Sequence, residues 1–424
     1  MGIEYLKRAS ESAATADGDV RGIVEEMLAD LEAGGEERAR AYGRELDGWD
    51  GDIVVSEAQL AGAGEALSPQ LRDDIRFAHD NVRRFAEAQR GSMSEVAIEV
   101  VPGLMAGHRH IPLRTAGCYV PGGRYAHVAS AIMSVTTARV AGVDRVVACS
   151  PPRGPEGVHA ATLFALDLCG ADVVLNLGGV QGIAALAFGM FGTPPADIVV
   201  GPGNAYVAEA KRALFGRVAI DMFAGPTESA IIADDSADAA IVAADLVGQA
   251  EHGPTSPVWL ISLDRGLAAR VMAKVPALIE ALPEPNRSSA ETAWQDHGEV
   301  VVCSSRDEAV RISDGYAPEH LQVQCRDLDW WLGALRDYGS LFLGEECTVA
   351  YGDKVSGPNH ILPTKRAARY TGGLWVGKFL KTVTWQRMTA EANRRVAPAC
   401  ARISRLEGME GHARSADVRV ARWG

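Results

Sequence analysis

The 424-residue sequence lacks a long apolar run, and it has no excess of positive charge. No stretch of 18 or more apolar residues is free of polar interruption, so we expect no membrane-spanning helix. Residues 1–19 do not contain the continuous apolar core of a signal peptide, which favours a cytoplasmic protein. A net charge of −13 at pH 7 argues against nucleic acid and anionic membranes as partners.

The seven cysteines follow no metal-binding or redox pattern. Their number is odd, and no two of them have the Cys-x-x-Cys spacing. In a reducing cytoplasm such cysteines are ordinarily free thiols, so we expect no disulfide framework.

What the sequence does contain is an alternation of short apolar runs with helical segments. A hydrophobic content of 47% over this length is enough for a large core and more than one domain. Residues 20–47 and 68–90 have helical spacing, the first with a Gly-Gly break and the second behind a serine suited to an N-cap. Seven apolar runs are expected as strands: 144–152, 171–179, 196–204, 229–235, 257–263, 298–305 and 339–346.

Strands that alternate with helices predict parallel sheets, so the fold class that we expect is α/β. It comprises two Rossmann-like parallel-sheet domains with small helical segments at both ends of the chain. The expected parts are an N-terminal arm over 1–14, a first domain over 15–114 with 227–377, a second domain over 115–226, and a helical C-terminal segment over 378–424.

Four glycine-rich segments follow the expected strands. They are YVPGGRYAH (119–127), LGGVQG (177–182), GPGNAY (201–206) and FAGPTES (223–229). In open α/β sheets a ligand binds beyond the carboxyl ends of the strands, and glycine lets backbone N–H groups approach a phosphate closely. The four segments together favour a nucleotide, although each alone also suits a tight turn. The fingerprint Gly-x-Gly-x-x-Gly is absent, so a dinucleotide would bind without it.

Two pairs of polar side chains have spacings compatible with metal binding or with acid–base catalysis. Gln249 and His252 follow an almost wholly apolar stretch and share one helix face. Imidazole is a common zinc ligand and glutamine a rare one, so spacing alone allows a metal site or a hydrogen-bonded helix end. Glu319 and His320 are adjacent, and an acid beside an imidazole suits general acid–base chemistry.

Two further polar segments lie towards the C-terminus. YGDKVSGPNHILPT (351–364) contains Asp353 and His360 and is too polar for a core. LEGMEGHA (406–413) contains Glu407, Glu410 and His412. No spacing indicates that these groups meet.

Eight motifs extend in order over nearly the whole chain: YVPGG, GGVQ, GPGNAYVAEAKR, AGPTE, QAEHG, APEHL, GDxxSGPNHxLPT and EGMEGH. In this combination the sequence resembles the histidinol dehydrogenase family. The resemblance implies a homodimeric enzyme that needs Zn²⁺ and NAD. It also implies the oxidation of a primary alcohol through an aldehyde to a carboxylate, with two NAD consumed.

The resemblance also implies roles for individual residues. The implied zinc ligands are Gln249, His252, Asp353 and His412. His320 is implied as the general base and Glu319 as the group that activates water. The implied NAD contacts are Tyr119, Gln181 and Asn204, and the implied substrate contacts are Thr227, His360 and Glu407. In the family the C-terminal segment crosses to the partner, so His412 and Glu407 would complete the neighbour's active site.

The sequence departs from a typical histidinol dehydrogenase in three places. Val349 stands where that enzyme usually has a glutamate, four residues before the zinc aspartate. A basic group follows the LPT motif, made of Lys365, Arg366, Arg369 and Lys378. Arg124 and His127 lie beside an expected cofactor loop. The loss of a glutamate and the gain of basic residues favour a substrate that carries a negative charge over one that carries a positive charge.

These departures resemble the branch of the family that oxidises 2,3-dihydroxypropane-1-sulfonate to sulfolactate with NAD. We therefore favour this small alcohol as the substrate over L-histidinol, with Arg124, His127 and Lys365 as candidate contacts. A non-catalytic member that binds only metal or nucleotide is the other alternative. The presence of Glu319, His320 and all four implied ligands argues against it.

Overall fold

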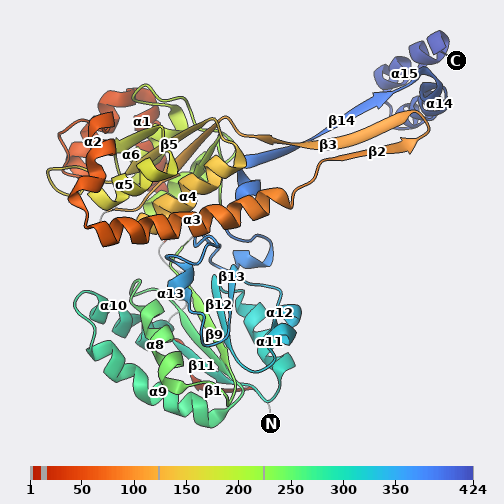
Figure 1. Cartoon of the computed structure of the whole chain (residues 1–424). Helices are drawn as coiled ribbons and strands as arrows, with labels where there is room; N and C mark the ends of the chain where they lie inside the picture. The colour runs from red at the N-terminus through yellow and green to blue at the C-terminus, as the bar shows by residue number, and fades with distance from the viewer. Residues whose placement is uncertain (1–2, 11–16, 123–124, 223–224, 424) are drawn as a thin grey trace. The chain divides into compact units, whose positions relative to one another are not determined.

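The computed structural model describes residues 3–10, 17–122, 125–222 and 225–423 (Figure 1). Its chain divides into two compact units, Met1–Ala88 with Leu113–Phe379 and Gln89–Pro112 with Leu380–Gly424. The first unit contains a five-stranded and a six-stranded sheet, and the second contains a three-stranded sheet. Helices connect most of the parallel strands, so the predicted α/β class is confirmed.

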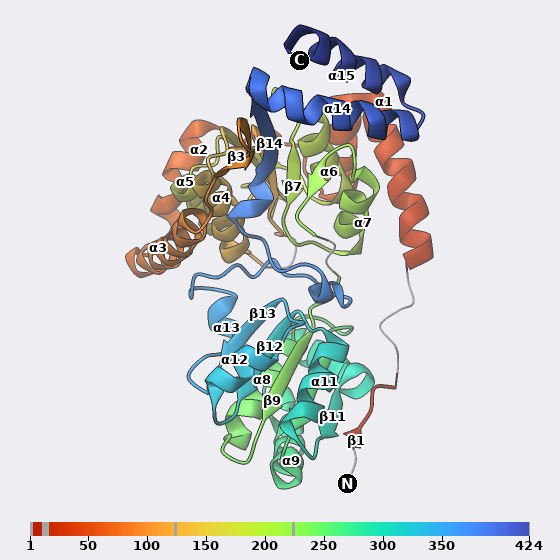
Figure 2. The ribbon, with the colours of Figure 1, turned by 90° about the vertical axis from the view of Figure 1, so that its right-hand side faces the viewer.

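Five parallel strands form one sheet of the first unit, in the order β6-β5-β4-β7-β8. They are β4 (Thr115–Tyr119), β5 (Arg145–Ser150), β6 (Val173–Asn176), β7 (Ile198–Val200) and β8 (Ala219–Ile220). The helices of this part are α4 (Val128–Ala141), α5 (Ala160–Cys169), α6 (Gly179–Phe188) and α7 (Ala205–Leu214). Figure 2 shows α6 and α7 on one face of this sheet and α4 and α5 on the other. The strands expected over 144–152, 171–179 and 196–204 are confirmed.

The N-terminal helix α1 (Asp17–Leu46) packs against α6 and α7. Its Leu28 and Leu31 share a hydrophobic core with Leu175 of β6. The assignment of 15–114 to one domain with 227–377 stays a prediction, but within the first unit α1 covers the five-stranded sheet. Helical spacing predicts an amphipathic helix but does not say which surface that helix covers.

The two other N-terminal helices are α2 (Glu57–Gly62), which contacts α5, and α3 (Pro69–Gly91). The Ser68 hydroxyl accepts a hydrogen bond from the Leu71 N–H at 3.2 Å, as expected for an N-cap. Within α1 the backbone departs from helical geometry at Gly35, whose φ is 56°, so the expected Gly-Gly break is confirmed.

The second sheet of the first unit has six strands in the order β1-β11-β10-β9-β12-β13, all parallel except β1. They are β1 (Glu4–Lys7), β9 (Ser229–Ala233), β10 (Val258–Ser262), β11 (Glu299–Val302), β12 (His320–Gln324) and β13 (Ser340–Leu343). Its helices are α8 (Ala239–Ala250), α9 (Arg265–Glu280), α10 (Asn286–Thr292), α11 (Arg306–Tyr316), α12 (Leu328–Ala334) and α13 (Val349–Gly352). Figure 1 shows α8 and α9 on one face and α11 and α12 on the other.

Four of the strands in this sheet were expected from their apolar runs. β12 and β1 were not expected: β12 alternates apolar residues with Gln322 and Gln324, and β1 lies in the segment assigned to an arm. Short helical turns complete the unit at Ala63–Ala66, Ala293–His297, Ala367–Arg369 and Val376–Phe379.

The second unit consists of β2 (Val96–Val101), β3 (Leu104–Pro112), β14 (Leu380–Met388), α14 (Ala390–Leu406) and α15 (Glu410–Trp423). The strand order is β14-β3-β2, all antiparallel, and the two helices pack together around small residues such as Ala397 and Ala413. The expectation of a wholly helical segment over 378–424 is corrected, because β14 precedes the helices. Its residues lie mostly exposed, so β14 lacks the apolar run that marks a buried strand.

Two expectations about the class of protein were also tested. All seven cysteines are free, so the prediction of unpaired thiols is confirmed. Among the residues that the structure describes, we found no helix long and apolar enough to span a bilayer.

Candidate active site

A cluster of buried acids and a histidine lies at the amino ends of two adjacent strands of the six-stranded sheet. Glu228 directly precedes β9, and Glu319 directly precedes β12, whose first residue is His320. These three residues are 3–7% exposed. Helix α11 ends at Ala317 in the left-handed conformation, with φ 48°, which turns the chain sharply into this position. The predicted catalytic pair therefore lies at the amino end of β12 in this sheet.

The hydrogen bonds of His320 define which ring nitrogen is basic. Its Nδ1 lies 3.3 Å from the carbonyl oxygen of Glu228, which only accepts a hydrogen bond, so Nδ1 carries the proton in the neutral ring. Nε2 then has the free lone pair. It is buried without a hydrogen-bond partner and lies 3.4 Å from Oδ1 of Asp353. In the neutral form of the ring, Nε2 is therefore the nitrogen that can accept a proton.

Burial changes the protonation of the cluster. It raises the pKa of Glu228 to about 7, although the Lys365 N–H opposes this by donating to Glu228 Oε1 at 2.8 Å. It also raises the pKa of Glu319, whose Oε2 accepts from the Glu228 N–H at 3.0 Å. Burial alone would lower the pKa of His320, but the charges of Glu319 and Asp353 outweigh it and raise that pKa. The cluster thus contains two carboxyls and an imidazole whose pKa values are all raised, as is common at functional sites.

Gln249 and His252 lie at the end of α8, close to this cluster. His252 Nε2 lies 3.9 Å from Asp353 Oδ2. Gln249 is 4% exposed, and its Oε1 has no hydrogen-bond partner. A hydrogen-bonded helix end would have satisfied that oxygen, so the unpartnered atom favours the alternative of a ligand site.

The full set of predicted zinc ligands is not assembled within one unit. Gln249, His252 and Asp353 belong to the first unit, whereas His412 and Glu407 belong to the second. Among the described residues, no group of three His, Cys, Asp or Glu side chains is close enough to hold a metal ion. His412 and Glu407 are exposed on the α14–α15 hairpin.

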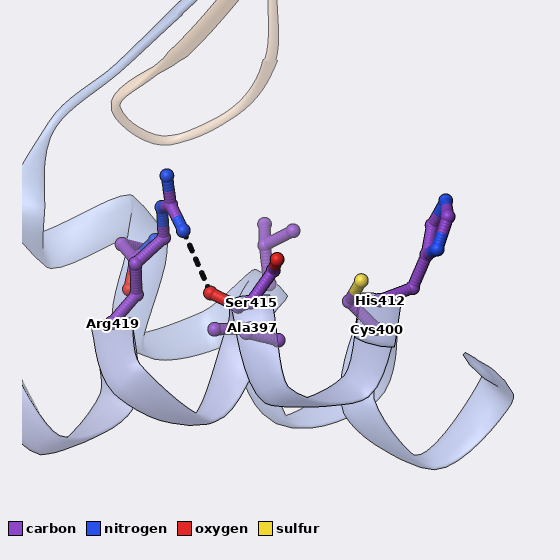
Figure 3. A pocket seen from close by; sticks show the side chains of 8 residues that line it. Ala397, Cys400, His412, Ser415 and Arg419 are labelled. Carbon is purple, nitrogen blue, oxygen red and sulfur yellow. Dashed lines mark hydrogen bonds between the residues drawn. The ribbon is translucent and has the colours of Figure 1, made fainter. Parts of the chain in front are cut away.

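His412 lines a groove of about 360 Å³ between these two helices. Figure 3 shows its imidazole projecting from α15 near Cys400 of α14. Further along the groove, the Arg419 side chain donates to the Ser415 carbonyl.

The predicted substrate contacts fall into two groups. Lys365 and Thr227 lie beside Glu228: Lys365 through its backbone N–H, and Thr227 as the preceding residue, half-buried. His360 is already engaged, because its Nδ1 donates to the Asp353 carbonyl at 2.9 Å and its Nε2 lies 2.8 Å from the Ser130 hydroxyl. His360 therefore holds the Asp353 loop against α4, and a substrate would have to replace one of these bonds.

Two other predicted contacts, His127 and Arg124, follow β4 in the sequence. His127 is half-buried at the start of α4, where burial and the nearby His360 and Lys354 lower its pKa to about 4. It is therefore a neutral hydrogen-bonding group at pH 7 and not a cation. Arg124 lies outside the described residues.

The glycine-rich loops lie at the carboxyl ends of the five-stranded sheet, as predicted. Tyr119 ends β4, and its hydroxyl accepts from the Gly179 N–H at 3.2 Å. A Cβ atom added to Gly201 would overlap the Tyr119 carbonyl oxygen, so only glycine fits this close approach. Tyr119 thus joins the loops after β6 and β7. Asn204 begins the helix α7 and accepts from the Val207 N–H at 3.1 Å.

Sequence reasoning missed two acids that support these loops. Asp47 accepts from the Gly178 N–H at 2.9 Å and from Gln181 Nε2 at 2.8 Å, which leaves the buried Gln181 Oε1 unpartnered. Asp221 pairs with Lys211 at 2.5 Å, and both side chains are at most 3% exposed. Both members of that pair bond to the Gly201 backbone. No local spacing indicates either contact, since the partners are 10 to 134 residues apart.

Known proteins are similar to this chain in both sequence and fold. A histidinol dehydrogenase family model matches residues 10–420. A "Histidinol dehydrogenase homolog" of Ruegeria pomeroyi is 60% identical over 99% of this chain and 97% of its own length. A crystal structure of histidinol dehydrogenase from Elizabethkingia anophelis aligns with a TM-score of 0.91 at 30% identity, over 98% of this chain and 94% of that one. The chain therefore belongs to the histidinol dehydrogenase family, as the motifs predicted, and is a dehydrogenase of that family.

Within the family the chain is more similar to some members than to others. The sulfopropanediol 3-dehydrogenase of Ruegeria pomeroyi is 57% identical over 100% of this chain and 97% of its own length. The histidinol dehydrogenase of Thermus thermophilus is 40% identical over 98% and 97%. The predicted resemblance to the sulfopropanediol branch agrees with this difference.

Proposed function

We propose that this protein is a zinc- and NAD-dependent dehydrogenase that oxidises a primary alcohol through an aldehyde to a carboxylate. The observation that carries the proposal is the unpartnered, buried Nε2 of His320, with Glu319 beside it. Oxidation of the alcohol carbon requires removal of the hydroxyl proton, and His320 Nε2 is the base that would take this proton. Glu319 would remove a proton from the water that attacks the aldehyde, and NAD, when bound, would supply the hydride acceptor for both oxidations.

Three residues near the acid–histidine cluster, Gln249, His252 and Asp353, have side chains that could bind a zinc ion. Gln249 Oε1 is a buried acceptor without a donor, and Asp353 and His252 provide carboxylate and imidazole groups beside each other. His412 from a second copy of the chain would complete an N/O ligand set that leaves room for substrate. When bound, zinc would orient the alcohol and polarise its oxygen.

The favoured substrate is 2,3-dihydroxypropane-1-sulfonate. The position that usually holds a glutamate in histidinol dehydrogenases is Val349, which is 1% exposed, so no carboxylate is available there for a cationic amino alcohol. Exposed Lys365 and Arg366 follow the LPT motif next to Glu228. The relative named sulfopropanediol 3-dehydrogenase supports this choice over L-histidinol.

One assay separates the candidate substrates and the order of oxidation. NADH formation is measured with 2,3-dihydroxypropane-1-sulfonate and with L-histidinol at equal enzyme concentration. We expect a preference of at least about 100-fold for the sulfonate and two NADH per alcohol. A 100-fold preference for histidinol would overturn the substrate choice, and a single NADH per alcohol would refute the four-electron reaction. No turnover of any alcohol would favour a non-catalytic binding protein.

The shared active site can be tested by mixing two inactive variants. In the proposed homodimer each site uses His320 of one subunit and His412 of the other. We expect His320→Asn and His412→Asn each to be inactive alone. When the two are unfolded and refolded together, heterodimers gain one intact site, so activity should return to about a quarter of the wild-type value. Refolded single variants are the control, and no recovery in the mixture would argue against sharing.

A further inference from the structure

Three elements that carry the proposed metal and catalytic residues also meet at a second polar cluster, one helical turn away. Its centre is Asp245 in α8, four residues before Gln249 and therefore on the same helix face. On β12 the partners are Gln322 and Gln324, which share a face of the strand with His320. The third partner is Thr348, which directly precedes α13 and lies five residues before Asp353.

The carboxylate of Asp245 accepts a hydrogen bond from each of these side chains. Oδ2 accepts from Gln322 Nε2 at 2.6 Å and from Gln324 Nε2 at 2.8 Å. Oδ1 accepts from the Thr348 hydroxyl at 2.9 Å. Thr348 occupies the N-cap position of α13, yet its side chain makes no capping bond there. Its hydroxyl therefore serves the contact with Asp245.

Asp245 is the acceptor that the two glutamines share, although Gln322 Nε2 also donates to the Cys347 carbonyl at 3.1 Å. They are 0% and 1% exposed, and both Oε1 atoms are unpartnered. Burying an amide with an unsatisfied oxygen costs free energy. A carboxylate that accepts from both Nε2 groups offsets part of that cost and stabilises the position of β12. Only an ionised carboxylate accepts all three donors without offering a proton of its own.

We propose that Asp245 is a positioning residue that holds α8, β12 and the start of α13 in register, so that Gln249, His320 and Asp353 face one another. This inference rests on the proposed function. Side chains that orient the ligands of a metal commonly change metal affinity by about 10- to 100-fold when they are replaced. Asp245 would act in this way on three elements at once and would not touch the substrate.

The test uses the full-length protein and measures zinc affinity by competition with a chelator. We expect Asp245→Asn to weaken zinc binding at least about tenfold and to lower kcat, with the KM for NAD unchanged. The matched control is Asp234→Asn. Asp234 is a buried carboxylate directly after β9 of the six-stranded sheet, and it accepts from the Ser236 and Arg326 N–H groups. The control should lose thermal stability without a change in zinc affinity.

A milder variant keeps the test decisive if Asp245→Asn does not fold. Thr348→Val removes one of the three donors and nearly preserves the side-chain volume, so we expect zinc binding to weaken about two- to fivefold. Wild-type zinc affinity in either folded variant would overturn the role of Asp245. If the wild-type protein itself binds no zinc, the proposed function fails instead, which distinguishes the two outcomes.

Discussion

The two sheets of the first unit support functional residues in different ways. In the five-stranded sheet, glycine-rich loops follow the carboxyl ends, and the N–H groups of Gly178, Gly179 and Gly201 donate to Asp47, Tyr119 and Asp221. In the six-stranded sheet, buried acids and His320 lie at the amino ends of β9 and β12. Under the proposed function, the loops of the first sheet would bind the nucleotide and the side chains of the second would transfer protons.

The connection between the two sheets explains why candidate functional residues lie at the carboxyl ends of one sheet and at the amino ends of the other. After β8 ends at Ile220, the chain enters β9 at Ser229 within eight intervening residues. A connection this short links the carboxyl end of one sheet to the amino end of the other. Glu228 lies in this connection, so it belongs by sequence to the glycine-rich segment but by contacts to the acid–histidine cluster.

The largest effect should come from His320, because the side-chain site carries the proton transfer. His320→Asn removes the basic Nε2, and we expect kcat to fall by about 10²- to 10⁴-fold. Steady-state kinetics at saturating NAD measure this effect. The affinity for NAD, measured by titration, should remain unchanged because the glycine-rich loops belong to the other sheet. A variant that keeps wild-type kcat would show that His320 is not the base.

The next largest effect should come from the ion pair behind the Gly201 loop. Lys211→Met leaves Asp221 buried without its cation, so we expect a loss of about 3–5 kcal/mol in the free energy of unfolding and a raised KM for NAD. Denaturant unfolding and kinetics provide the measurements. Lys274→Met, at an exposed lysine of α9, is the matched control. Equal stability of the two variants would contradict a structural role for the pair.

A smaller effect should follow from Glu228 and should depend on pH. Its pKa is raised in the folded protein to about 7, so proton uptake favours folding below the unfolded pKa, and this contribution is lost as the pH rises through 7. Glu228→Gln is neutral at every pH and avoids that loss. We expect its stability relative to wild type to increase by about 1–3 kcal/mol between pH 5 and pH 9.

Thermal unfolding across this pH range measures the Glu228 effect. The matched control is Glu291→Gln, at an exposed glutamate, whose difference from wild type should stay constant. A constant difference for Glu228→Gln as well would show that this carboxyl does not remain protonated in the folded protein.

The smallest effect should come from the Tyr119 hydroxyl. Tyr119→Phe removes one acceptor for the Gly179 N–H, which is worth about 1 kcal/mol. We expect the KM for NAD to rise by about fivefold with little change in kcat, measured by steady-state kinetics. Tyr370→Phe, at a 77% exposed tyrosine, should leave both constants unchanged. A fall in kcat alone would place Tyr119 in the chemistry rather than in the cofactor loops.

Prediction of strands from sequence succeeded where both faces of a strand are buried by apolar residues. Apolar runs identified β5, β6 and β7, and glycines marked the turns after them, because a strand buried on both faces has no need of polar residues. It failed for β12, where Gln322 and Gln324 interrupt the apolar pattern. Both glutamines donate to Asp245, which lies 77 residues before Gln322 in the sequence, so no local pattern predicts this contact.

The sequence by itself determined the family, the α/β class and the candidate chemistry, because motifs and apolar periodicity are local properties of the chain. Only the tertiary structure decided that the acid–histidine cluster lies at strand amino ends, that Glu228 belongs to it, and that α1 covers the five-stranded sheet. The reason is that burial and long-range hydrogen bonds set which nitrogen of His320 is basic and which oxygen of Gln249 is unpartnered. These properties depend on residues far apart in the chain and exist only once it has folded.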